Sequence, residues 1–108
     1  MILTAAEAKE ALGYSPDEQM PARVESILLP AIDDFLKNAT GKDWGKLTES
    51  YTTVDPLAKQ AASVLLVRWF DNPSQIGSAN TSFGYGPDLG IMSLITQLHA
   101  KALQEAAT

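Results

Sequence analysis

Residues 56–71 read Pro-Leu-Ala-Lys-Gln-Ala-Ala-Ser-Val-Leu-Leu-Val-Arg-Trp-Phe-Asp, a segment that contains the most apolar run of the chain. Asp55 is a suitable helix N-cap and Pro56 a suitable first helical residue, so a helix is predicted here. One side of it carries Leu57, Ala61, Val64, Leu65 and Arg68, and much of the rest is covered by Ala58, Ala62, Leu66, Trp69 and Phe70. A helix that is apolar nearly all round is the buried centre of a bundle, or is covered by a partner subunit.

Two earlier helices are predicted from their start signals. Thr4 and Glu7 are spaced as a capping box, which predicts a helix over residues 4–13 that ends at a glycine. The next helix begins either at Ser15, with a bend, or near Met20 after a single separate turn. The start signals leave both alternatives open.

The long second helix has an apolar stripe and a proline inside it. The stripe consists of Val24, Ile27, Leu28, Ala31, Ile32, Phe35 and Ala39, and Gly41 is the predicted stop. Pro30 lacks an amide hydrogen and its ring crowds the carbonyl of Ser26, so a kink is expected there. On the polar face, Asp33 is spaced to pair with Lys37.

Two connections are longer than usual and both carry aromatic residues. Residues 42–55 are polar and include a short β-prone stretch; Trp44 within them is either a lid on the core or an interface anchor. Residues 72–88 are rich in glycine and turn-forming residues and hold Phe83 and Tyr85. This second loop is either a partner-binding arm or a mobile surface loop whose rings pack locally.

A last helix follows the glycine-rich loop. It is predicted to start at Pro87 or Asp88 and to fray near Ala106, with an apolar face made by Leu94, Ile95, Leu98, Ala102 and Leu103. The fold class is therefore all-α. Residues 1–108 form a single domain, a small bundle of about four helices with a long glycine-rich loop before the last helix.

Composition excludes several classes of site. The chain has no cysteine and one histidine, so disulfides, thiolate metal sites, cysteine nucleophiles and histidine-rich metal clusters are ruled out. Residues 1–55 carry 5 basic and 10 acidic side chains, a net charge of −5, whereas residues 56–108 carry 3 of each. That balance argues against a protein that holds nucleic acid through its phosphates. The acidic half is either ordinary helix surface or a surface that repels passing DNA.

No catalytic constellation is visible in the sequence. His99 has no partner acid or nucleophile nearby in the chain, and Asp33 and Asp34 are adjacent and so point to different sides of a helix. The glycines of residues 84–90 do not have phosphate-loop spacing, and Pro87 removes an amide that could bind phosphate. We therefore expect no enzyme activity, no cofactor, no metal and no membrane span, since the longest apolar run is about half the length of a span. The first residues carry no basic, apolar signal for secretion.

The order of motifs resembles the gp6-like head–tail connector family of tailed bacteriophages, the adaptors that sit below the portal. The motifs are Leu3-Thr4-Ala5-Ala6-Glu7-Ala8-Lys9 at the first helix, Thr40-Gly41 followed by Trp44, Pro56-Leu57-Ala58-Lys59-Gln60-Ala61, Trp69-Phe70-Asp71-Asn72, and Pro87-Asp88-Leu89-Gly90-Ile91 with Leu94-Ile95. They cover nearly the whole chain in order and spacing. Two features depart from the family: Pro73 stands where a basic residue often follows the asparagine, and the last helix is longer than usual.

The resemblance implies a structural protein of the virion neck that is made in the cytoplasm of a host bacterium. Roughly a dozen copies would form a cyclic ring in head-to-tail contact. The ring would dock on the portal protein after DNA packaging, meet a stopper or tail-completion protein on its other side, and let DNA pass without sequence-specific binding. Surfaces covered by neighbouring subunits or by the portal would then include five aromatic residues, namely Trp44, Trp69, Phe70, Phe83 and Tyr85.

A different class of function remains open, a small helical regulator that binds one partner protein as a monomer or dimer. Ring formation separates the two hypotheses, because a regulator has no need of a closed ring with a central hole.

The arm hypothesis for the glycine-rich loop makes a direct prediction. Replacing Phe83 and Tyr85 together by serine should leave the fold and the melting temperature nearly unchanged and abolish assembly into rings. Thermal unfolding and light scattering on the same sample measure both properties. If the double variant unfolds instead, the two rings belong to the core and the arm hypothesis is wrong.

Overall fold

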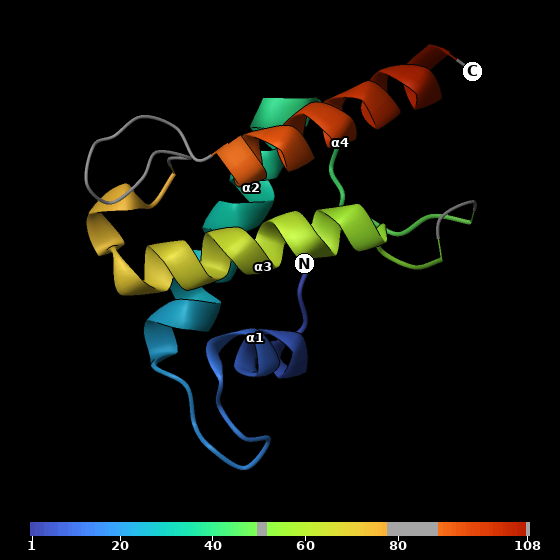
Figure 1. Cartoon of the computed structure of the whole chain (residues 1–108). Coiled ribbons are helices and arrows are strands. Elements are labelled where there is room, and N and C mark those ends of the chain that lie inside the picture. The colour runs from blue at the N-terminus through green and yellow to red at the C-terminus, as the bar shows by residue number, and fades with distance from the viewer. Residues whose placement is uncertain (50–51, 78–88, 108) are drawn as a thin grey trace.

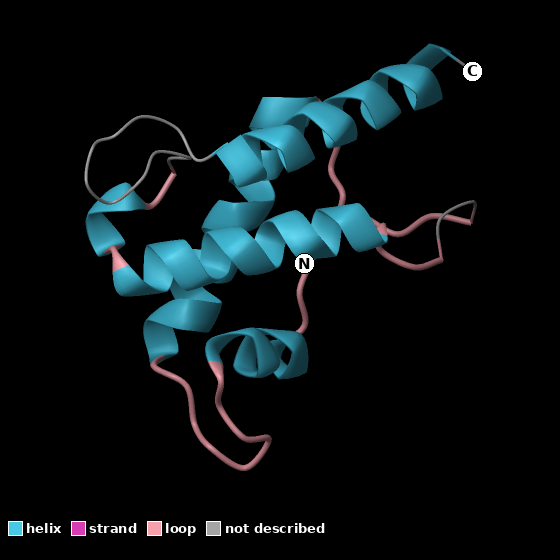
Figure 2. Cartoon of the chain, in the orientation of Figure 1, coloured by secondary structure: helices cyan, strands magenta, loops and turns pink. Residues whose placement is uncertain are grey.

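The computed structural model describes residues 1–49, 52–77 and 89–107. These residues form four α-helices and no strand, as Figure 2 shows, so the prediction of an all-α bundle is confirmed. In chain order the elements are α1 (Ala5–Leu12), a π-helical segment η1 (Val24–Leu28), α2 (Leu29–Thr40), α3 (Pro56–Asp71), a 3₁₀ turn η2 (Pro73–Gln75) and α4 (Leu89–Ala107). The described part of residues 42–55 is loop.

Helix α3 lies at the centre of this arrangement. It packs against α1, α2 and α4, and Figure 1 shows α1 on one side of it and α2 and α4 on the other. Its buried side chains are Ala58, Ala61, Ala62, Leu65, Leu66 and Trp69. The Trp69 ring packs edge-on against the Phe35 ring of α2, with centroids 5.5 Å apart. The prediction that residues 56–71 form the buried centre is confirmed.

The predicted N-caps of α1 and α3 are both present. Thr4 accepts a hydrogen bond from the Glu7 amide, and the Glu7 carboxylate accepts one from the Thr4 amide, which completes the capping box. Asp55 Oδ1 accepts the Leu57 amide at 2.8 Å. Each cap satisfies amides that the first helical turn leaves without a partner inside the helix.

The second helix begins near Met20, after a separate turn, so the later of the two predicted starts is the observed one. The Glu18 amide donates to the Ser15 carbonyl to close that turn. Helical backbone then starts directly after Pro21.

Pro30 is accommodated by η1. Here the Leu29 amide donates to the Val24 carbonyl, five residues back, where an α-helix would bond four residues back. This wider turn lies directly before Pro30, which has no amide hydrogen to donate. Pro30 then falls in the first turn of α2. The expected distortion therefore takes the form of π-helical winding.

The π-helical turn also changes which side chains face the core. The predicted stripe included Ile27 and Ala39, but Ile27 is 53% exposed and Ala39 is exposed as well, while Leu29 and Leu36 are buried. The stripe assumed α-helical geometry throughout, and the extra residue in the turn rotates the positions on either side of it relative to one another.

The loop that follows α2 covers the C-terminal end of that helix. Gly41 has φ 82°, a conformation that favours glycine, and it turns the chain so that Trp44 folds back over the helix end. The Trp44 Nε1–H donates to Thr40 Oγ1 at 2.8 Å, and the Thr40 hydroxyl donates to the Leu36 carbonyl at 2.6 Å. Both side chains are buried, so one hydroxyl satisfies two buried polar groups.

The N-terminal segment packs across α2 and this loop. The Ile2 amide donates to Asp33 Oδ1 at 3.1 Å, so Asp33 binds this segment, whereas the sequence spacing had suggested a pair with Lys37. Burial raises the pKa of Asp33, and the hydrogen bond from Ile2 opposes that shift only in part. A Cβ added to Gly45 would lie 3.1 Å from the Ile2 nitrogen, so the two backbones are close.

Helix α4 packs on α2 and α3 through its first half. Ile91, Ile95 and Leu98 are buried, and the helix ends close to the predicted Ala106. Leu103, predicted to lie on the apolar face, is 59% exposed because the last turns extend beyond the other helices (Figure 1). The start of the helix is predicted at residues that lie outside the described part of the chain.

The Thr40 hydroxyl gives a test of the α2 end. Thr40→Val keeps the shape of the side chain but leaves the buried Trp44 N–H without its acceptor, so the free energy of unfolding should fall by about 1–3 kcal/mol. Thr40→Ser keeps the hydroxyl and is the matched control; it should cost less than the valine variant. Urea unfolding measures both variants, and equal losses would contradict this account.

Candidate protein-interaction surface

The two tryptophans predicted as interaction residues lie inside the monomer. Trp69 is 0% exposed and Trp44 is 4% exposed. For Trp44 the structure matches the lid alternative, since its ring covers the end of α2. In this conformation neither side chain offers a surface that a partner could contact directly.

Phe70, the third predicted residue, is half-buried between two side chains from other elements. The Arg23 guanidinium lies 4.5 Å from the centre of its ring, and Arg23 Nη2 donates to the Phe70 carbonyl at 3.1 Å. The Tyr14 ring meets Phe70 edge-on, with centroids 6.5 Å apart. Phe70 therefore joins the end of α3 to the segments before and after the turn at residues 15–18.

Phe83 and Tyr85, the remaining two predicted residues, fall within residues 78–88. They lie outside the described part of the chain, as does most of the glycine-rich loop.

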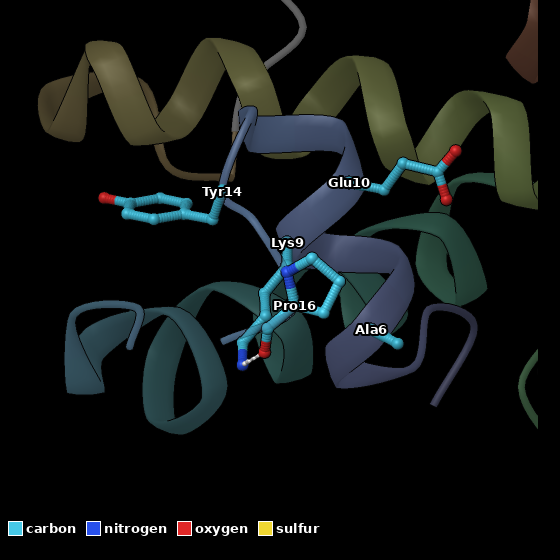
Figure 3. A pocket seen from close by; sticks show the side chains of 5 residues that line it. All are labelled: Ala6, Lys9, Glu10, Tyr14 and Pro16. Carbon is cyan, nitrogen blue, oxygen red and sulfur yellow. Dashed lines mark hydrogen bonds between the residues drawn. The ribbon is translucent and has the colours of Figure 1, made fainter. Parts of the chain in front are cut away.

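A hollow of about 380 Å³ lies beside α1 and is lined by Ala6, Lys9, Glu10, Tyr14 and Pro16 (Figure 3). Lys9 Nζ donates to the Pro16 carbonyl at 3.1 Å, so this lysine is used to hold the turn after α1. The Tyr14 hydroxyl and the Glu10 carboxylate point to opposite sides (Figure 3). Polar groups that diverge in this way do not form the convergent set that a small-molecule site requires.

Two further hollows lie between α1 and α3 and share the small residues Ala11 and Ser63. One, of about 260 Å³, is bounded by Leu3, Glu7, Glu10 and Lys59. The other, of about 420 Å³, is bounded by Gln60, Val64, Val67 and Arg68. We call the two together the α1–α3 groove. Charged side chains line one end, whereas the other end combines Arg68 with two valines, of which Val67 is 39% exposed.

The charged end of the α1–α3 groove is held by an ion pair. Lys59 of α3 pairs with Glu7, whose carboxylate also completes the capping box of α1. The lysine and the hydrogen bond from the Thr4 amide together hold the pKa of Glu7 below its usual value, against a smaller opposing effect of burial. One carboxylate therefore caps α1 and fixes α1 against α3.

The described residues contain no group of three or more side chains that could ligate a metal ion. His99 is exposed on α4. None of the described helices has both the length and the apolar character that crossing a membrane requires.

Sequence reasoning missed the cluster of Arg23, Phe70 and Tyr14. Arg23 and Phe70 are 47 residues apart in the chain, and neither belongs to a spacing pattern that brings them together. The α1–α3 groove was missed for a related reason, because it depends on how two helices cross. A comparison of the chain with models of protein families, with curated proteins and with solved structures finds no match.

The depressed pKa of Glu7 predicts a pH dependence. A carboxyl whose pKa is lower in the folded state adds stability above its unfolded-state pKa and loses that contribution as the pH falls through its folded-state pKa. Glu7→Gln keeps an oxygen that can accept the Thr4 amide but removes the charge facing Lys59. It should lower the free energy of unfolding by roughly 0.2–1 kcal/mol at pH 7.

The difference in the free energy of unfolding between the wild type and Glu7→Gln should shrink at a pH below the usual pKa of a carboxyl group. There the wild-type carboxylate is itself protonated. Urea unfolding from pH 7 down to about pH 2 follows this difference. Glu25 is exposed on η1, so Glu25→Gln is a matched control for the loss of one carboxylate charge. A Glu7→Gln difference that stays constant across the acid range would contradict the assignment.

Proposed function

We propose that this chain is a structural connector of the gp6-like head–tail type. Copies of it form a ring beneath the portal of a tailed bacteriophage, extend the DNA channel and link head to tail after packaging. Its work is mechanical, and its partners are further copies of itself, the portal protein and a stopper or tail-completion protein. Its place is the virion neck, after synthesis in the cytoplasm of the host.

The observation that carries this proposal is where the resembling motifs fall in the fold. Thr4 and Glu7 form the cap of α1, Thr40 and Trp44 close the end of α2, and Pro56 is the first residue of α3. The motifs that resemble the connector family therefore coincide with the joints of the bundle. Motif residues that hold the joints of a bundle suit a protein whose function depends on its shape.

Two further features are in keeping with a mechanical function. Two lysines that line the hollows hold the fold, Lys9 through the Pro16 carbonyl and Lys59 through Glu7. The net charge of −5 resides in residues 1–55, and an acidic surface repels DNA phosphates and so favours sliding over binding.

The experiment that tests the proposal is particle mass as a function of protein concentration, measured by light scattering, with negative-stain images of the heaviest fraction. We expect a closed ring of roughly a dozen copies with a central hole. Because association follows mass action, the ring fraction should rise with protein concentration.

A closed two-fold dimer at every concentration would contradict the connector proposal and favour the alternative, a small helical regulatory module. A monomer throughout would move the test to isolated portal rings used as a template. Failure to bind a portal ring from the phage or prophage that carries the gene would then overturn the proposal.

A further inference from the structure

The two halves of α4 are attached to the rest of the molecule in different ways. In the first half, Ile91, Ile95 and Leu98 are buried in the core. After Leu98 none of the described side chains is buried: Ala102 is partly buried against the core and Leu103 is exposed. Figure 1 shows these last turns extending beyond the other helices.

Two ion pairs attach the second half. Lys101 Nζ lies 2.9 Å from Asp55 Oδ2, and Glu105 pairs with Lys42. Lys101 and Glu105 are four residues apart and so lie on one face of α4. Their partners stand at the start of α3 and just after the end of α2, so the two pairs fasten α4 to both helices.

The two carboxylate oxygens of Asp55 bind different partners. Oδ1 accepts the Leu57 amide and caps α3, while Oδ2 receives Lys101. Burial is the largest single influence on the pKa of Asp55 and raises it, but the hydrogen bonds from Lys101 and Leu57 together outweigh burial and lower the pKa. The cap of α3 uses only Oδ1, so it can persist when the pair between Lys101 and Oδ2 breaks.

All four charged side chains of these pairs keep some exposure to solvent. Pairs of this kind contribute much less than buried apolar side chains and are weakened by salt. A helical piece this short is marginal in water once it loses its tertiary contacts. Opening of the last turns would therefore also unwind them.

We propose that residues 99–107 form a salt-sensitive strap, a segment that opens separately from the core and is fastened by the Lys101–Asp55 and Glu105–Lys42 pairs. The strap opens as ionic strength rises, while the first half of α4 and the cap of α3 stay in place. This inference stands on contacts within one chain and is independent of the proposed function.

The test is amide hydrogen exchange of the full chain, read residue by residue by NMR, at about 20 mM and about 1 M NaCl. The Debye screening length falls from about 20 Å to about 3 Å over this range. We expect exchange in residues 99–107 to become roughly three- to tenfold faster at high salt. Residues 91–98 and α3 should change by less than about twofold. No change in the strap, or an equal increase along the whole chain, would overturn the proposal.

Single substitutions separate the strap from ordinary fraying of a helix end. Lys101→Met and Glu105→Gln keep helix propensity nearly unchanged, and each breaks one ion pair. Both should speed exchange of residues 99–107 at low salt and reduce its salt dependence. If only the helix dipole mattered, Glu105→Gln would slow exchange, because an acidic side chain near a helix C-terminus is unfavourable. That result would also overturn the proposal.

Asp55→Asn tests whether the two oxygens act separately. Asparagine caps helices well, so this variant should keep α3 protected and loosen the strap as much as Lys101→Met does. Lys46→Met, at an exposed position, is the matched control for loss of a positive charge and should leave the strap unchanged. Loss of α3 protection in Asp55→Asn, or a loosened strap in Lys46→Met, would contradict the assignment.

Discussion

The need to cover α3 on nearly all sides governs the rest of the structure. Its fully buried residues, such as Leu65, Leu66 and Trp69, demand an apolar neighbour in several directions at once. Helices α1, α2 and α4 each supply one, and α1 is too short to be stable alone. Helices α2 and α4 also pack on each other, so α3 is the common neighbour of all three outer helices rather than their only contact.

The polar groups of this fold serve mainly at its joints. Glu7 caps α1 and pairs with α3, Asp55 caps α3 and pairs with α4, and Thr40 joins α2 to Trp44. In each case one side chain satisfies a helix end and fixes a second element. Because these side chains are used within the fold, they are not available to converge on a ligand, which is in keeping with the proposed connector function.

Local signals in the sequence were enough to predict the helices and two of their caps. The capping box at Thr4 and the Asp55 start depend on residues adjacent in the chain, which is why they could be read directly. The sequence did not predict the exposure of Ile27 or the Arg23–Phe70 contact, and for Trp44 it left burial and an exposed interface as two alternatives. These features depend on a π-helical turn and on the packing of segments that are distant in the sequence. The spacing of residues along the chain does not indicate either of them.

The π-helical turn at Val24–Leu28 has a consequence for how this chain can change in length. A π-helical turn is an α-helical turn with one residue added, so the surrounding helix already accommodates an insertion. Loss of one residue there would return the helix to regular winding and keep α2 in register with α3, but it would bring the Pro30 ring against the carbonyl four residues before it. A one-residue deletion within α3 would instead rotate every later core residue away from its neighbours. A one-residue change in length should therefore be less disruptive at η1, where it affects one turn, than within α3, where it affects the whole core.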